Sequence, residues 1–446
     1  MSQDNTRYEE LVEKITEQAR ALAQRMVNEV AEAAVGLDKL EERSVEVSRE
    51  FGNHLLGGLY QIIAERDEGQ STLNCDCGQK MAARGKRPLT CTTLLGRVVV
   101  QRRYYLCASC RQGKAPLDYQ LGLCAGSFSR GLSELMALLG ATQDAFEQAT
   151  DVLQRLTLVE VSSSSLRRVT TELGALARAE EEAVVVAAWA GDDPEIENQI
   201  AADHPFYISM DGIMVNNREI GWKECKVGAV YHTKVDRNNK VRAIDHSYIA
   251  DLTTAAPFGQ PLWVEAQRRG LARASHVVVI GDGAEWIWKL AAEHFPQATQ
   301  IVDWYHASQY VWSAARAIYG EEEQATQWAD RALTALSEGR LKDLCKNLRT
   351  HDALPEVSTS LTYFLNNQSR MHYDRYRAQG LQIGSGSIES ACKSVVAQRL
   401  KLAGMRWNHA SARAVVTLRA RLKSDRWHQT SRLLSPKRSR SLPAAA

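Results

Sequence analysis

The sequence predicts a multidomain α+β protein, and three observations support that fold class. The chain has 446 residues, which is enough for two to four domains of ordinary size. Hydrophobic spacing changes in blocks along the chain, from a helical period to strand-like runs and back. The chain is 44% hydrophobic and 24% charged, which is typical of folded domains and excludes disorder over the whole length.

Charge is also distributed in blocks. The net charge is only +2, but residues 1–70 carry 8 basic and 15 acidic side chains, residues 71–125 carry 9 and 2, and residues 391–440 carry 13 and 1. Two concentrated basic regions in a nearly neutral protein favour a nucleic-acid partner over a small substrate. A solvated basic tail is the alternative interpretation of the last region.

Residues 1–70 are predicted to form a helical N-terminal region. Apolar side chains recur near a 3.6-residue period over residues 7–66, and Gly36 and Gly52 are candidate breaks in the helix. Because no strict heptad repeat persists, the pattern permits a dimerising hairpin without requiring one. The first ten residues are polar and acidic, unlike a signal peptide, and no apolar run reaches the ~18 residues of a membrane span. We therefore expect a soluble cytoplasmic protein with no membrane partner.

Residues 71–125 are predicted to form a zinc-ribbon-like, DNA-binding module. Two cysteine pairs, separated by strand-like runs at 89–95 and 98–106, are the candidate Zn²⁺ ligands: Cys75, Cys77, Cys107 and Cys110. Tetrahedral Zn²⁺ prefers four such ligands from two tight turns. The first pair is one residue shorter than usual, so Cys91 is an alternative ligand, and four buried structural thiols are the alternative interpretation. Arg102 and Arg103 are candidate DNA contacts.

Residues 126–186 are predicted to form a helix-turn-helix-like DNA-binding region. A break at 157–161 and a run of serines suited to an N-cap precede a second helix that carries Arg167 and Arg168, the candidate DNA contacts. Two plainly packed helices would show the same pattern. Residues 187–205 contain Gly, Asp and Pro and are predicted to be a linker.

Residues 206–430 are predicted to form a mixed α/β domain. The expected strands, in chain order, are 206–215, 222–232, 241–249, 276–280 and 299–302, with helices at 257–271 and 286–295. The fourth strand is wholly apolar, as in a strand buried on both faces. Three strands, a helix and two strand–helix units are the element order of a ribonuclease-H-like sheet. Helical spacing at about 307–383 predicts a helical insertion within this domain.

Three acidic residues in this domain are candidate metal ligands. Asp211 lies inside the first strand, and Asp282 follows the buried fourth strand between two glycines. Unpaired carboxylates at such positions are costly, and in this fold both face one crevice. Glu389, near the start of a late helix, is the third acid, and a helix-capping role is its alternative. Carboxylate oxygens suit two Mg²⁺ (or Mn²⁺) ions placed about 3.5–4 Å apart.

The basic C-terminal region is expected to contact DNA phosphates. The candidate contacts are Lys393, Arg399, Lys401, Arg406, Arg413 and Arg419, several of which share helix faces. Trp407 and His409 could stack on an exposed base, although core packing of Trp407 is an equal alternative. Residues 431–446 are expected to be a disordered basic tail.

The combination of motifs resembles a known family. Met210–Gly212 (MDG), Gly281–Trp288 (GDGAEWIW), Asp303–His306 (DWYH) and Gly384–Ser390 (GSGSIES) look like DDE transposases of bacterial insertion sequences, especially the ISKra group related to the Mutator-like superfamily. The cysteine region followed by Pro116–Asp118 and Leu121–Leu123, and the segment Arg399–Trp407, are also similar to that group. The resemblance covers about residues 71–425. The order and spacing of the motifs together are specific to this family, whereas each motif alone has only modest specificity.

The resemblance implies a transposase that binds the terminal inverted repeats of its element and catalyses metal-dependent strand cleavage and strand transfer. It implies Asp211, Asp282 and Glu389 as catalytic metal ligands, and Asp303 and His306 as the family's D-x-x-H motif. His306 would lie beside the metal site, and a structural histidine at a helix start is its alternative. Asp303 is expected to be a helix cap. The implied partner is double-stranded DNA, bound by a homodimer or higher oligomer in the bacterial cytoplasm, at the nucleoid.

Three other classes remain open at this stage. A ribonuclease-H-like nuclease without strand transfer would keep the acids but need no DNA-binding leader. A non-catalytic DNA-binding protein derived from a transposase, or a regulator stabilised by zinc, would use the acids for structure only.

The absence of a Walker-type phosphate loop in the sequence fits a direct transesterification that needs no ATP.

Overall fold

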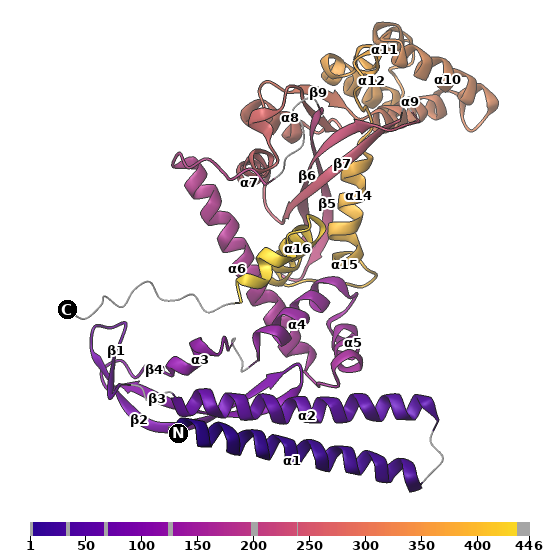
Figure 1. Cartoon of the computed structure of the whole chain (residues 1–446). Helices are drawn as coiled ribbons and strands as arrows, with labels where there is room; N and C mark the ends of the chain where they lie inside the picture. The colour runs from indigo at the N-terminus through magenta and orange to yellow at the C-terminus, as the bar shows by residue number, and fades with distance from the viewer. Residues whose placement is uncertain are drawn as a thin grey trace. The chain divides into compact units, whose positions relative to one another are not determined.

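The computed structural model describes residues 3–32, 36–66, 70–123, 128–197, 204–238 and 240–434. Figure 1 shows the whole chain, which forms two compact units. The first unit comprises residues 1–170 and 431–446, and the second comprises residues 171–430. The expected linker does not mark this division. The division falls between Thr170 and Thr171, inside the continuous helix α6 (Ser163–Trp189). Residues 198–203 of the expected linker and 435–446 of the expected tail lie outside the described residues.

The first unit begins with two 30-residue helices, α1 (Gln3–Glu32) and α2 (Leu37–Arg66), which pack as an antiparallel hairpin (Figure 1). Gly36 lies between them, as expected of a helix break. The second candidate break was wrong, since Gly52 lies within α2. A Cβ at Gly52 would lie 3.2 Å from the side chain of Leu95, so this glycine permits close packing of α2 on the neighbouring β-hairpin.

A small antiparallel sheet follows, in the order β1-β2-β3-β4. Its strands are β1 (Thr72–Asn74), β2 (Lys80–Thr93), β3 (Gly96–Cys107) and β4 (Gly113–Lys114). The short helix α3 (Pro116–Gln120) follows the sheet. Ala64 of α2, Val100 of β3 and Leu117 of α3 form a shared core. The helix α2 therefore stabilises the sheet that carries the cysteine pairs.

The rest of the first unit is helical. The helices α4 (Arg130–Thr142) and α5 (Phe146–Thr157) pack with the start of α6 around a common apolar core that includes Leu132, Met136, Leu153 and Leu166. The hydroxyl of Ser162 accepts a hydrogen bond from the Ser165 N–H, which caps α6 as the serine run predicts. The expected arrangement of two helices joined by a short turn is present, but its use in DNA binding stays a prediction.

The second unit contains a mixed five-stranded sheet in the order β7-β6-β5-β8-β9. The strands are β5 (Phe206–Asn217), β6 (Gly221–Val235), β7 (Val241–Asp251), β8 (Val277–Gly281) and β9 (Thr299–Val302). The first three are antiparallel neighbours, and β8 and β9 run parallel to β5. This is the predicted multidomain α+β class, and the mixed sheet is consistent with a ribonuclease-H-like fold.

Helices cover both faces of this sheet. On one face, Phe258 and Leu262 of α7 (Ala255–Arg268) pack on Gly228 of β6, and Ile287 of α8 (Glu285–His294) packs on Gly281 of β8. The 3₁₀ turn η1 (Leu271–Arg273) leads from α7 to β8. The other face is covered by α14 (Gly386–Ala391), the π-helical turn η3 (Cys392–Ala397), α15 (Gln398–Leu400) and α16 (His409–Lys423).

The predicted helical insertion is present. It consists of α9 (Trp304–Tyr319), α10 (Glu323–Ser337), α11 (Leu341–Arg349), α12 (Pro355–Asn367), the 3₁₀ turn η2 (Gln368–Arg370) and α13 (Tyr373–Ala378). It begins directly after β9 and ends before α14. A last short helix, α17, spans Trp427–Arg432. Within the described ranges, no helix is long and apolar enough to cross a membrane.

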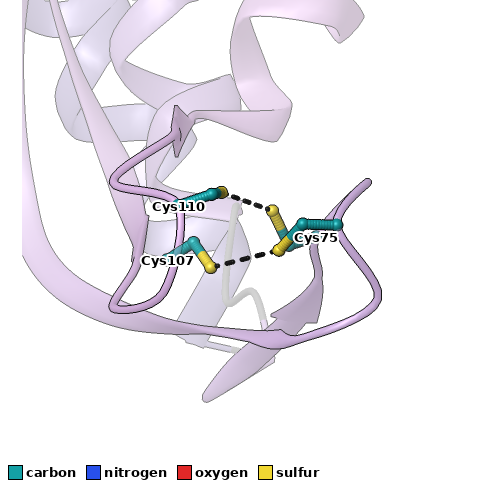
Figure 2. A group of neighbouring side chains, drawn as sticks. Cys75, Cys107 and Cys110 are labelled. Carbon is teal, nitrogen blue, oxygen red and sulfur yellow. Dashed lines mark hydrogen bonds between the residues drawn. The ribbon is translucent and has the colours of Figure 1, made fainter.

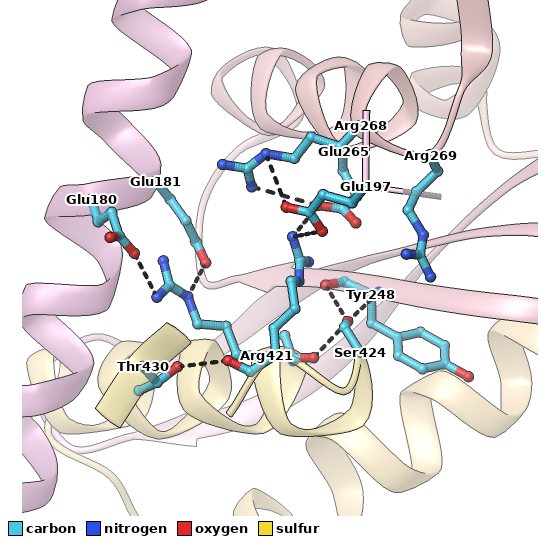
Figure 3. A network of polar contacts seen from close by, with 12 residues as sticks. Glu180, Glu181, Glu197, Tyr248, Glu265, Arg268, Arg269, Arg421, Ser424 and Thr430 are labelled. Atoms are coloured by element: carbon cyan, nitrogen blue, oxygen red, sulfur yellow. Dashed lines mark hydrogen bonds and ion pairs between the residues drawn. The ribbon is translucent and has the colours of Figure 1, made fainter. Parts of the chain in front are cut away.

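Ion pairs of two buried arginines hold α16 against α6 and α7 (Figure 3). Arg421 of α16 pairs with Glu180 and Glu181 of α6, each at 2.8 Å. Arg426, just beyond α16, pairs at 2.9 Å with Glu265 of α7, which is only 2% exposed. Buried charges are tolerated only when they are paired in this way. These ion pairs tie α16 to α6 and to α7, which covers the opposite face of the sheet.

The crossing of α6 and α16 gives a stability prediction. A Cβ at Gly174 would lie 2.5 Å from the backbone oxygen of Ala414, so Gly174→Ala should push the helices apart and cost on the order of 1–3 kcal/mol. The control is Gly386→Ala, a helical position with nothing within 4 Å, which should leave the melting temperature unchanged or slightly raised. Thermal denaturation followed by circular dichroism measures both, and equal melting temperatures would show that the crossing is not tightly packed.

Candidate functional site

Three aspartates lie in a row across the parallel strands, with Asp282 and Asp303 directly after β8 and β9 and Asp211 inside β5 at the same level. Ser209 of β5 pairs with Ile280 of β8, so Asp211 and Asp282, each two residues further on, occupy equivalent positions. Gly281 pairs with Val302 of β9, so Asp303 follows at the next position. Neighbouring strands are about 4.8 Å apart, and the register therefore brings the three carboxylates to one edge of the sheet.

Asp211 is held in a partly buried, electrostatically unfavourable position. Its Oδ1 accepts a hydrogen bond from the Gly212 N–H at 2.6 Å, and its Oδ2 accepts one from the Cys392 thiol at 3.5 Å. Burial raises the pKa of Asp211, and the nearby charge of Asp282 raises it further. The nearby charge of His306 offsets these effects only in part, so the chemistry of the carboxylate pair fits a bound cation.

Asp282 is oriented by the turn that follows β8. Its Oδ1 accepts a hydrogen bond from the Ala284 N–H at 2.8 Å, and its backbone oxygen accepts one from the Tyr363 hydroxyl at 2.8 Å. Gly283 has a left-handed φ of 106°, and a Cβ there would lie 2.6 Å from the Tyr363 ring. Only glycine fits this turn, which explains the glycine that follows the acid.

Asp303 is a structural acid, as expected of a helix cap. It is fully buried and accepts hydrogen bonds from the His306 N–H at 2.7 Å, from the His306 ring and from the Ser385 N–H. Burial acts to raise the pKa of Asp303, but these hydrogen bonds outweigh it and the pKa is lowered. The same contact raises the pKa of His306, helped by the charges of Asp303, Asp282 and Asp211, so a positive imidazolium is favoured beside the acids.

Glu389 is exposed on α14, three residues before Cys392. The burial of the Cys392 thiol raises its pKa, and the charges of Asp211 and Glu389 add to that effect. Cys392 therefore lies within electrostatic reach of both acids. The sequence did not identify Cys392 as a site residue, because only the pairing of a late helix with β5 brings it to Asp211.

The carboxylate oxygens of the three candidate acids lie too far apart to surround a single ion together. Among the described residues, the group of ligand atoms lying within 4.8 Å of one another consists of the four cysteines alone. A site for two ions needs no such tight set, since its ions lie about 3.5–4 Å apart and each carboxylate contacts one or both. Carboxylate oxygens are hard donors, the kind that divalent cations such as Mg²⁺ prefer.

The four cysteines of the first unit form a compact cluster (Figure 2). The Sγ atoms of Cys75 and Cys110 are 3.4 Å apart, and those of Cys77 and Cys107 are 3.7 Å apart. These distances exceed a disulfide bond and are close to the edge of about 3.8 Å expected for a tetrahedron of sulfurs around Zn²⁺. The cluster could hold a zinc ion, and the alternative ligand Cys91 is not part of it.

Backbone hydrogen bonds close both turns that carry the cysteine pairs, which holds the thiols in place for a zinc ion. The N–H of Gly78 bonds to Cys75 O at 3.0 Å, and the N–H of Arg111 bonds to Cys107 O at 3.1 Å. Gly78 and Arg111 both have left-handed φ angles, 83° and 63°. Backbone N–H groups of Cys110 and Ser109 lower the pKa of Cys107 to about 7. At Cys110 the Gln112 N–H acts to lower the pKa, but hydrogen bonds with the other thiols of the cluster outweigh it and raise the pKa to about 12. Cys107 is therefore the thiol prepared to ionise, and zinc binds thiolates.

The structure separates the candidate DNA contacts into exposed and internal groups. The exposed ones are Arg167, Arg168, Lys393, Lys401 and Arg406. Arg103 is partly exposed, and its DNA contact stays a prediction. Arg102 is engaged with Asp118, and Arg413 with Asp251, so a phosphate would compete with an existing ion pair at either position.

Two of the expected phosphate contacts need correction. Arg399 is 1% exposed and its guanidinium lies 4.7 Å from the centre of the Trp407 ring, which is itself 5% exposed. Arg419 is 4% exposed and donates to backbone carbonyls of the π turn. Both arginines are packed inside the unit, and Trp407 takes its core alternative. The backbone N–H of Trp407 bonds to Asn216 O at 2.9 Å, which ties this loop to the end of β5.

Comparison with known proteins identifies the family. The chain matches the uncharacterised protein family UPF0236 over residues 30–432, and it belongs to that family. A search of curated proteins returns no match. The match spans both the cysteine cluster and the acidic residues of the mixed sheet.

The cysteine cluster predicts a metal content. The purified protein should carry about one Zn²⁺ per chain, measured by inductively coupled plasma mass spectrometry. Cys107→Ala should lose it, because one of four ligands is removed. Cys91→Ala is the matched control, a fully buried cysteine of the same sheet, and should retain the ion. Zinc loss in both variants, or in neither, would contradict the assignment.

Because its surroundings disfavour the charged form of Asp211, replacing this carboxylate by a neutral side chain should raise the free energy of unfolding. The folded-state pKa of Asp211 is raised, so its stabilising contribution is fully present below the unfolded-state pKa and is lost as pH rises through the folded-state value. Asp211→Asn should therefore raise the melting temperature at pH 7 without Mg²⁺, by roughly 2–4 °C for each kcal/mol gained. The gain should shrink at acidic pH. A lower melting temperature for the variant at pH 7 would contradict this electrostatic account.

Proposed function

We propose that the protein is a DDE-type transposase, which binds the inverted repeats at the ends of its element and carries out DNA strand cleavage and strand transfer. The observation that carries the proposal is the register of β5 and β8, which aligns Asp211 with Asp282. A glutamate on the helix that returns to the sheet, Glu389, completes a set of three acids. Membership of UPF0236 neither supports nor opposes a transposase activity, because that family is uncharacterised.

The acids would act by holding divalent cations on the scissile phosphate. Asp211, Asp282 and Glu389 are the residues that would bind Mg²⁺ or Mn²⁺, which would activate the attacking oxygen and stabilise the leaving oxygen. The chain itself keeps Asp211 and Asp282 oriented through the N–H groups of Gly212 and Ala284. In strand transfer the attacking oxygen is a DNA 3′-hydroxyl, so one phosphodiester bond replaces another and no nucleotide cofactor is consumed.

The remaining residues supply charge and positioning. His306, with its raised pKa, would place a positive charge near the DNA phosphate. Exposed Lys393, Lys401 and Arg406 would contact phosphates without reading sequence. The cysteine module and the helices α4–α6 are the parts proposed to recognise the terminal repeats, through residues such as Arg103, Arg167 and Arg168. Two ends must be joined, so the proposal includes a dimer or larger assembly on DNA, acting in the bacterial cytoplasm.

The test is a strand-transfer assay in Mg²⁺ or Mn²⁺ on DNA that carries the sequences flanking this gene. Wild type should give joined products, whereas Asp282→Asn and Glu389→Gln should lose them by at least ~100-fold, because each removes a metal ligand. Glu356→Gln is the control, an exposed acid in the first turn of another helix of the same unit, and should stay active.

The other outcomes separate the alternatives. Nicked but unjoined DNA from wild type would favour a nuclease of the same fold. DNA binding without cleavage, unchanged in both acid variants, would leave a DNA-binding protein and remove the catalytic role of the acids. Joining by wild type and by Asp282→Asn alike would place the active site elsewhere.

A further inference from the structure

The helix that carries Glu389 contains an unusual turn. Helical geometry is α-type over Gly386–Ala391, π-type over Cys392–Ala397 and α-type again to Leu400. The N–H of Gln398 bonds to Lys393 O, five residues earlier, which is the signature of a π turn. Such a turn accommodates an extra residue, is less stable than an α-helix and is often found at functional sites. It needs support from outside the helix.

Arg419 supplies that support. Its Nε donates to Val395 O at 2.7 Å, and its Nη2 donates to Ser394 O and, at 3.4 Å, to the side-chain oxygen of Gln398. The first two acceptors belong to the π turn and the third to the residue that follows it. Because Arg419 is only 4% exposed, its charge must be stabilised by such acceptors. The Arg419 side chain, which extends from α16, therefore holds the π turn by hydrogen bonds to its carbonyl oxygens.

The supported turn places a donor on Asp211. Cys392 is the first residue of the π turn, and its thiol donates to Asp211 Oδ2. The other oxygen, Oδ1, accepts from the Gly212 N–H. Both carboxylate oxygens are thus oriented, one by its own strand and one by the helix. Glu389 lies three residues before Cys392, on the same side of the helix, so the same turn sets the position of Glu389 relative to Asp211.

We propose that Cys392 and Arg419 are positioning residues for the acid cluster, with Arg419 holding the π turn and the thiol of Cys392 orienting Asp211 toward a bound cation. This rests on the proposed function in one respect, namely that Asp211 is a metal ligand. Hydrogen-bonded groups behind metal ligands typically change metal affinity or activity by about 10–100-fold when they are removed. Neither residue contacts the reacting atoms.

The test compares Cys392→Ala, which removes the donor, with Cys392→Ser, which keeps one. Mn²⁺ affinity, measured by electron paramagnetic resonance of the zinc-loaded full-length protein, should fall about 10-fold or more in the alanine variant and return to within about 3-fold of wild type with serine. The control is Cys345→Ala, a buried cysteine of α11, which should bind Mn²⁺ as wild type does. Equal Mn²⁺ affinity in Cys392→Ala and wild type would overturn the role of Cys392.

The link between the two residues is tested by Arg419→Lys, alone and combined with Cys392→Ala. A lysine ammonium cannot span the acceptors that the guanidinium reaches, so Mn²⁺ affinity should fall in the single variant. If Arg419 acts through Cys392, the two losses should be clearly non-additive in the double-mutant cycle. Additive losses would overturn the link. If Arg419→Lys fails to fold by circular dichroism, the Cys392 series still decides the first part.

Failure of this inference is distinguishable from failure of the proposed function. A wild type that neither binds Mn²⁺ at the acid cluster nor cleaves DNA would overturn both, since Asp211 would then hold no metal. A wild type that binds Mn²⁺ in a manner lost in Asp282→Asn, with Cys392→Ala unchanged, would leave the metal site intact and overturn only the positioning role. A 10-fold loss in Cys392→Ala with rescue by serine supports the inference even where strand joining is absent.

Discussion

The buried carboxylate of Asp303 is the constraint on which the second unit depends. It is fully enclosed at the end of β9 and bonds to His306 at the start of α9 and to Ser385 just before α14. The N–H of Trp304 also bonds to Ile383 O at 2.9 Å. The helical insertion therefore leaves the sheet and returns to it at one point. Its length does not disturb the sheet, and α14, the helix that carries Glu389, begins directly after Ser385.

The buried acids of this unit fall into two groups that differ in the direction of their pKa shifts. Burial alone would raise the pKa of every one of them. At Asp303 hydrogen bonds outweigh burial, and at Glu265 the nearby Arg426 and Arg268 outweigh it, so the pKa is lowered in both. At Asp211 burial prevails, and Asp282 adds to it. Asp211 is thus the acid of the three whose environment disfavours the carboxylate, although both of its oxygens accept hydrogen bonds, and a group of this kind is a candidate for a functional role.

The sequence predicted the parts of the fold that depend on local pattern. The order of strands along the chain, the helical insertion, the place of Asp211 inside a strand and that of Asp282 after one follow from hydrophobic spacing and from glycines in tight turns. It failed where a side chain's role depends on contacts distant in sequence. Arg399 and Arg419 belong to a basic helical stretch that looks like a DNA-binding face, yet both are buried by packing on Trp407 and on the π turn. Arginine serves either role, and only the tertiary neighbours decide between them.

The two candidate metal sites differ in chemistry in a way that would keep their metals apart. The cluster in the first unit offers four sulfurs, and soft thiolate ligands select zinc over magnesium. The acids of the second unit offer hard oxygens, which suit Mg²⁺ or Mn²⁺. Cys392 brings a sulfur to the second site, where its thiol donates to Asp211 Oδ2. A protonated thiol can orient a carboxylate without adding a soft thiolate to the donor set of the site.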